Sequence, residues 1–146
     1  MARSLVIRKG KGFSRTWKKE LKKIDKSYGV GFHKESRHFD GQFVAAIAAF
    51  QEFGTGNIPA RPFMRQAIDS NLDNLKRAYF IAMKSDNLRP RALEIVARKL
   101  LAGIQDQIIS IKKPRNAKST IRRKGFDNPL IETGLMLESV KSKRLS

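Results

Sequence analysis

The longest periodic stretch of the chain, residues 62–111, reads PFMRQAIDSNLDNLKRAYFIAMKSDNLRPRALEIVARKLLAGIQDQIISI. Apolar side chains recur in it every three or four residues, which places them on one face of a helix. They are Met64, Ile68, Leu72, Leu75, Tyr79 and Met83, and then, after a break at residues 86–90, Leu93, Val96, Leu100, Ile104, Ile108 and Ile111. Pro62 suits a first helical turn, and Pro114 closes the second series. The sequence therefore predicts two long helices in succession.

A shorter helix is expected just before this pair. Residues 43–50 show no alternation of polar and apolar side chains and are rich in alanine. Phe43, Ile47 and Phe50 share one helical face, so we expect a buried helix that ends at Gly54.

Two short strands are expected near the ends of this helical region. Residues 30–33 alternate in the manner of a strand, and residues 140–145 show a weaker strand pattern. If the two pair, the fold class is α+β, with several helices packed on a small, mostly antiparallel sheet. The length of 146 residues fits a single domain spanning residues 1–146.

The N-terminal part of the chain is amphipathic and basic. We expect residues 1–12 to form an N-terminal arm or an edge strand. A helix is predicted over residues 14–28, with Gly29 ending it, because apolar side chains there recur at helical spacing. These side chains are Phe13, Trp17, Leu21, Ile24 and Tyr28.

The C-terminal part is polar before the second strand. Residues 112–128 are predicted to form a basic loop in which Ser119 caps a single helical turn that Gly125 ends. Thr133 is predicted to cap another short turn, which reaches Met136.

Charge is the main compositional feature. Lys and Arg number 31 against 13 Asp and Glu, so the formal net charge is +18. Both ends are strongly basic and the middle is nearly balanced. A positive charge of this size indicates a polyanionic or acidic partner, of which nucleic acid is the commonest.

There is no cysteine, which excludes a thiolate metal site or a cysteine nucleophile.

No signal peptide or membrane span is expected, because the opening apolar run is short and no stretch approaches the roughly 18 apolar residues of a span.

Residues 33–40 contain His33, His38 and two carboxylates, which raises the hypothesis of a metal-dependent nuclease. Their spacing matches no ligand signature, so we expect no metal, no cofactor and no catalytic residue. The glycines of residues 54–57 lack the lysine of a phosphate-binding loop and favour a chain reversal.

Two segments together resemble the neck, tail-completion and virion-morphogenesis proteins of tailed bacteriophages. Residues 48–65, AAFQEFGTGNIPARPFMR, are similar to one hallmark of that family. Residues 116–136, NAKSTIRRKGFDNPLIETGLM, are similar to its closing motif. The order and spacing also match, with a helical region between.

The resemblance implies an α+β structural subunit and not an enzyme. It implies a homo-oligomeric ring of six copies at the head–tail junction, between the connector and the tail-terminator or tail-tube proteins. Packaged double-stranded DNA would pass nearby. The expected location is the neck of the virion, and the host cytoplasm during assembly.

Two sets of residues are expected to serve this role. Subunit contacts are predicted for Glu52, Phe53, Arg61, Phe63 and Arg65, with the two phenylalanines as apolar anchors. Arg61 is expected to pair with a carboxylate that fixes the loop, and Glu52 is one candidate for it. An equally open alternative places both phenylalanines in the core. Contacts to DNA phosphates are predicted for Lys18, Lys19, Lys22, Lys23, Lys112, Lys113, Arg115, Arg122, Arg123 and Lys124. A free DNA- or RNA-binding protein is the alternative function.

Overall fold

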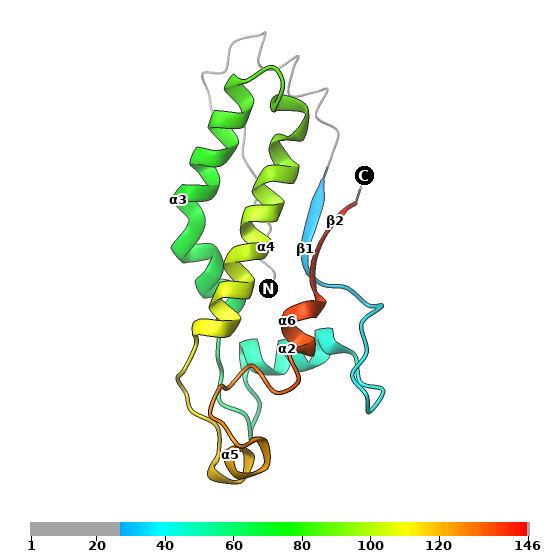
Figure 1. The fold of residues 1–146 in the computed structure, drawn as a ribbon, viewed down its shortest axis with the longest axis vertical. Helices are drawn as coiled ribbons and strands as arrows, with labels where there is room; N and C mark the ends of the chain where they lie inside the picture. The colour runs from blue at the N-terminus through cyan, green and yellow to red at the C-terminus, as the bar shows by residue number, and fades with distance from the viewer. Residues whose placement is uncertain (1–26, 146) are drawn as a thin grey trace.

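The computed structural model describes residues 27–145, and an antiparallel pair of long helices dominates it (Figure 1). The helices are α3 (Phe63–Lys84) and α4 (Ala92–Ser110), and the 3-10 turn η1 (Arg89–Arg91) leads into α4. Both predicted helices are therefore confirmed. Their facing stripes bury Phe63 and Ala67 from α3 and Ile104 and Ile108 from α4.

A two-stranded antiparallel sheet packs beside α4. Strand β1 (Tyr28–Phe32) pairs with β2 (Val140–Arg144), with Phe32 opposite Val140 and Tyr28 opposite Arg144. The predicted strand pairing and the α+β class are confirmed. Of the helix predicted over residues 14–28, residues 14–26 lie outside the described residues. The prediction that Tyr28 belongs to that helix is wrong, because its backbone joins the strand ladder.

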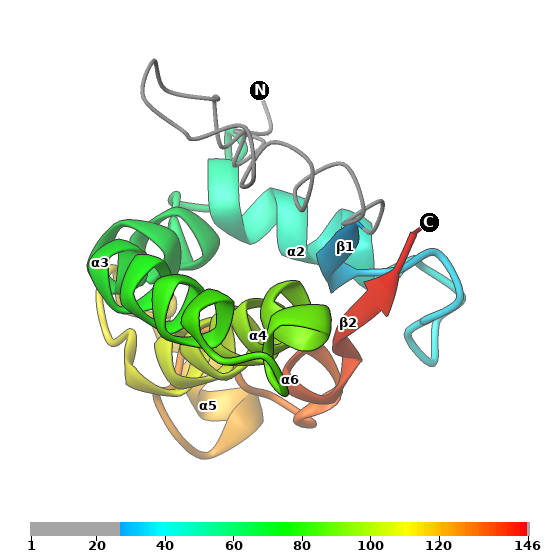
Figure 2. The ribbon, with the colours of Figure 1, turned by 90° about the horizontal axis from the view of Figure 1, so that it is seen from above.

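Helix α2 (Val44–Phe53) lies across one end of the sheet and the helical pair, as Figures 1 and 2 show. The predicted helix is confirmed, but the predicted buried face is wrong. Val44 and Ala48 face the core, whereas Phe43 and Phe50 are 41% and 47% exposed. The small Ala48 joins a core cluster that includes Phe63, so the large rings lie on the other side.

Two short helices complete the fold: α5 (Lys118–Lys124) and α6 (Leu135–Ser139). Residues 112–128 are therefore not wholly a loop. Ser119 lies inside α5 and does not cap it, since the helix starts directly after Ala117, while Gly125 ends it in a left-handed conformation (φ 79°). Gly134 precedes α6, and the Thr133 hydroxyl accepts a hydrogen bond from the Leu135 N–H. No helix within residues 27–145 is long and apolar enough to cross a membrane.

Candidate functional site

A buried carboxylate joins α2 to α3. Glu52 is 6% exposed and accepts hydrogen bonds from the backbone N–H groups of Met64 (2.9 Å) and Arg65 (3.2 Å). These N–H groups lie in the first turn of α3, where the helix dipole favours a negative charge. Pro62 precedes α3 and provides no side-chain cap. Glu52 therefore caps α3 from the preceding helix.

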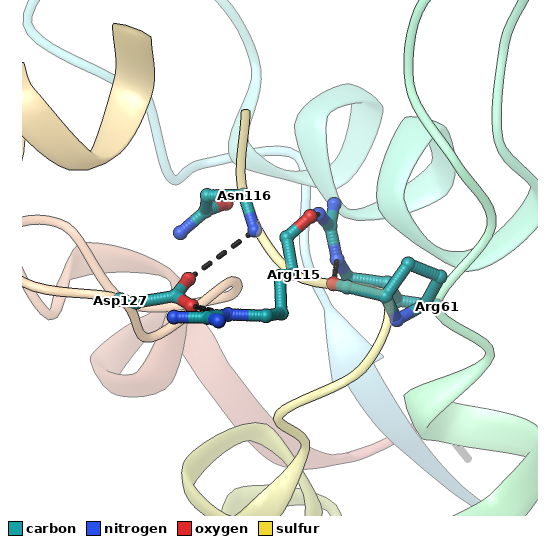
Figure 3. A network of polar contacts seen from close by, with 5 residues as sticks. Arg61, Arg115, Asn116 and Asp127 are labelled. Atoms are coloured by element: carbon teal, nitrogen blue, oxygen red, sulfur yellow. Dashed lines mark hydrogen bonds and ion pairs between the residues drawn. The ribbon is translucent and has the colours of Figure 1, made fainter. Parts of the chain in front are cut away.

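A buried guanidinium joins the loop after α2 to the segment after α4. Arg61 is 3% exposed. Its Nε donates to the Pro114 carbonyl (2.8 Å) and its Nη2 to the carbonyl of Arg115 (3.1 Å), next to which it lies in Figure 3. Its Nη1 donates to Oε1 of Gln51 (2.7 Å). Burial lowers the pKa of Arg61, and the nearby negative charge of Asp127 opposes that effect.

The predicted ion pair between Arg61 and Glu52 is wrong. The acceptors of Arg61 are two carbonyls and one amide oxygen, while the oxygens of Glu52 bind the start of α3. The carboxylate whose charge acts on the pKa of Arg61 is instead that of Asp127, which sequence reasoning missed. Nothing in the sequence pattern of the basic segment indicated that Asp127 would bind Arg115 and Asn116.

Asp127 anchors the backbone next to Arg61. Its carboxylate accepts hydrogen bonds from Nε of Arg115 (2.5 Å) and from the Asn116 N–H (3.2 Å), as Figure 3 shows. The hydrogen bond from Arg115 is the main cause that lowers the pKa of Asp127; burial opposes it, and the hydrogen bond from the Asn116 N–H adds a smaller lowering effect. Arg61 and Asp127 thus hold residues 114–116 from two sides.

The turn between α2 and α3 depends on Gly54. Its φ is 76°, and a Cβ there would lie 2.9 Å from the Ile58 carbonyl oxygen and 2.9 Å from the Ala60 nitrogen. The Thr55 hydroxyl accepts hydrogen bonds from the N–H groups of Asn57 and Ile58. The glycines therefore serve a chain reversal, in agreement with the sequence interpretation.

A cleft of about 320 Å³ lies between this turn and α5. Both segments that carry the family resemblance contribute to it, through side chains that include Pro59, Arg61, Arg123, Lys124 and Leu135. Arg123 pairs with Glu132 at 2.6 Å. Lys124 donates to the Asn128 carbonyl, and burial lowers its pKa.

The predicted subunit-contact residues divide into two groups. Glu52, Arg61 and Phe63 are buried and organise the subunit itself. Phe63 is 0% exposed, so its prediction as an anchor for a neighbour is wrong and the core alternative holds for it. Phe53 is 61% exposed. The Arg65 side chain is 57% exposed, with its Nε 3.9 Å from Oε1 of Glu52, so both residues present surface to a partner.

The predicted phosphate-contacting residues also differ in availability. Lys18, Lys19, Lys22 and Lys23 lie outside the described residues. Arg115 and Arg123 are exposed but paired with carboxylates, and the half-buried Lys124 belongs to the cleft. Lys112 donates to the Ile109 carbonyl. Among residues 27–145, Lys113 and Arg122 are exposed cations with no hydrogen-bonding or ion-pair partner.

The carboxylates of residues 33–40 have separate partners. Glu35 lies 3.5 Å from Lys143 of β2, and Asp40 lies 3.1 Å from Nδ1 of His38. Hydrogen bonds from the backbone, its own N–H for Glu35 and that of Gln42 for Asp40, are the main cause of the lowered pKa of each carboxyl. Within the part of the chain that the structure describes, no three His, Cys, Asp or Glu residues form a potential metal site.

No protein-family model, curated protein or solved structure matches this chain.

Proposed function

We propose that this protein is a structural subunit of a phage head–tail junction, where it forms a ring that joins the connector to the tail. The observation that carries the proposal is the set of hydrogen bonds from the buried Arg61 to Gln51, Pro114 and Arg115. Arg61 belongs to the first segment that resembles the neck and tail-completion proteins, and it binds the carbonyls of Pro114 and Arg115, which directly precede the second segment. A resemblance in two distant segments gains weight when both build one cleft.

Two exposed residues of the first resembling segment are available to a neighbour. Phe53 ends α2 and Arg65 lies in the first turn of α3. Aromatic residues, phenylalanine included, and arginine are enriched at protein interfaces relative to the rest of the surface. A ring needs two different complementary patches on each subunit, and this surface would be one of them.

The charge suits a channel for DNA. The net charge of +18 includes exposed cations in and before α5, notably Lys113 and Arg122. Phosphate contacts hold a duplex without reading its sequence, as a passage for packaged DNA requires. The same cations favour the second candidate, a free DNA- or RNA-binding protein, which would remain outside the virion.

Cryo-electron microscopy of virions from the phage that encodes the chain separates the two candidates. A ring with this fold between connector and tail tube is the expected result. Absence of the chain from purified virions, checked by mass spectrometry, would overturn the proposal in favour of the free nucleic-acid binder.

A pair of matched variants tests the contact surface. Phe53→Asp places a charge at a side chain that is 61% exposed, and Phe80→Asp does the same on α3, where the side chain is 56% exposed. We expect a phage carrying Phe53→Asp to give few tailed particles and one carrying Phe80→Asp to give normal numbers. Normal assembly with Phe53→Asp would exclude Phe53 from the contact.

A further inference from the structure

The segment between β1 and α2 projects from the rest of the subunit in Figures 1 and 2, and its backbone forms a closed turn. Arg37 and Phe43 pair in an isolated β-bridge, and the guanidinium carbon of Arg37 lies 4.0 Å from the centroid of the Phe43 ring. The His38 carbonyl accepts a hydrogen bond from the Gly41 N–H (2.9 Å), and Gly41 has the left-handed conformation (φ 86°) that such a turn requires. These contacts hold Phe39 at the tip of the turn.

Phe39 and Asp40, which we call the tip, are the side chains that this turn presents to solvent. Phe39 is 84% exposed, more than any other large apolar side chain of residues 27–145. The Asp40 side chain is 41% exposed, and its carboxylate accepts a hydrogen bond from the Gln42 N–H (3.0 Å). An aromatic side chain on a fixed turn loses little conformational freedom when a partner buries it. The tip therefore offers a preorganised apolar anchor beside a negative charge.

The cleft between residues 54–60 and α5 has the complementary chemistry. Ile58, Pro59 and Leu135 line it, and all three are at least partly exposed. Arg123 lines it as well, with a side chain that is 64% exposed. A guanidinium has five N–H donors, and the ion pair with Glu132 engages Nη1 of Arg123. The cleft of about 320 Å³ has room for a phenyl ring, since an apolar cavity of about 150 Å³ already binds benzene.

The tip does not fill the cleft of its own subunit. His38 lines that cleft, whereas the ring of Phe39 does not line it and lies in solvent. Copies that each carry a net charge of +18 repel one another at long range, so a contact between them needs short-range attraction. Apolar burial and a carboxylate that meets an arginine both supply such attraction.

We propose that the tip of one subunit occupies the cleft of a second copy of the chain. The ring of Phe39 packs against Leu135 of that copy, and the Asp40 carboxylate approaches its Arg123. Tip and cleft are different patches of the surface, as the closure of a ring requires. The inference rests on the proposed function, because it names one contact of the proposed ring.

Disulfide cross-linking of the full chain tests the contact, since the chain contains no cysteine. Gln42→Cys lies beside the tip and leaves it intact, and Asn57→Cys lies in the wall of the cleft. A mixture of these two variants should form a disulfide between two chains, in about 150 mM salt to screen the long-range repulsion. Gln42→Cys mixed with Ser70→Cys, at an exposed position on α3, is the control and should form at least tenfold less.

Sedimentation measures how much the tip contributes. Phe39→Ala should weaken self-association on the order of tenfold, whereas Phe80→Ala, which removes a 56% exposed ring from α3, should leave it unchanged. Circular dichroism verifies that each variant is folded. A chain that stays monomeric up to about 1 mM, or a Phe39→Ala variant that associates like the unsubstituted chain, would overturn the proposal.

Cryo-electron microscopy of virions tests the ring separately from the contact. A neck ring in which the tip lies outside the neighbouring cleft would overturn the contact and leave the proposed function standing. Absence of the chain from virions, together with the expected disulfide between purified chains, would overturn the ring and leave the contact standing.

Discussion

The Nε atom of Arg61 lies 2.8 Å from the carbonyl oxygen of Pro114, in a hydrogen bond that joins two loops 53 residues apart. The same guanidinium reaches the next carbonyl and the side chain of Gln51. Its acceptors point in different directions, so a planar fork of donors suits them better than a single ammonium. The loop after α2 and the segment after α4 thus depend on one side chain.

Replacing Arg61 with Lys is expected to destabilise the protein by roughly 2–4 kcal/mol, because a lysine keeps the charge but leaves buried acceptors without donors. Chemical denaturation followed by circular dichroism measures the loss. Arg65→Lys is the matched control, since the Arg65 side chain is 57% exposed and should lose less than about 0.5 kcal/mol. Equal stability of the two variants would contradict a structural role for the Arg61 fork.

Replacing Glu52 with Gln removes the charge that caps α3. An amide keeps one acceptor oxygen, but its NH2 group faces an N–H that needs an acceptor. The loss of capping and of the favourable dipole interaction should cost roughly 1–2 kcal/mol. Asp73→Asn, which neutralises an 85% exposed carboxylate further along α3, is the control and should change the free energy of unfolding little. A loss no larger than that of the control would show that Glu52 is not an important cap.

The sequence was sufficient for the elements that periodicity encodes. The stripes of α3 and α4, the strand patterns of β1 and β2 and the turn at Gly54 all follow from spacing and glycine chemistry. It was insufficient where tertiary contacts choose between two apolar faces. Helix α2 is apolar around most of its circumference, so spacing alone could not show that Val44 and Ala48, and not Phe43 and Phe50, face the core.

The candidate site shows the same limit for polar residues. Motif resemblance identified Glu52 and Arg61 as important, and burial of both charges is consistent with that. Their partners are backbone groups of distant segments, which no side-chain pattern encodes. Pairing the two charges with each other was the simplest inference from composition, and the fold instead provides each with separate partners.

Phe63 and Phe53 differ in burial although they lie only ten positions apart. Phe63→Ala should destabilise the protein by roughly 3–5 kcal/mol, because the ring is 0% exposed and meets Phe32 edge to face. Phe53→Ala should change stability by less than about 0.5 kcal/mol. Thermal and chemical unfolding of both variants measure the contrast. Similar losses for the two would mean that Phe53 is also packed in the folded subunit.

Asp127 should make stability depend on pH in the acid range. Its pKa is lowered from the usual 3.8, so its contribution is fully present above that value and is lost as pH falls through the folded pKa. The stability advantage of the unsubstituted chain over Asp127→Asn should be largest above about pH 5 and should shrink below about pH 4. Arg115→Gln removes the main cause of the lowered pKa of Asp127. The stability advantage of the unsubstituted chain over Arg115→Gln should therefore also shrink below about pH 4. If the difference in unfolding free energy between the unsubstituted chain and Asp127→Asn did not change with pH, the Asp127 carboxylate would not be the group that titrates.

Arg122 should contribute to DNA binding through charge alone. It is exposed in α5, and its guanidinium has no ion-pair partner among residues 27–145. Arg122→Gln should weaken binding to duplexes of unrelated sequence by similar factors and should reduce the slope of log affinity against log salt by about 1. Fluorescence anisotropy with labelled duplexes at several salt concentrations measures both quantities. Lys99→Gln is the control, because it removes an equal charge from an exposed position on α4. If the control lowers the slope as much as Arg122→Gln does, the positive field of the whole subunit attracts DNA and α5 is not a contact surface.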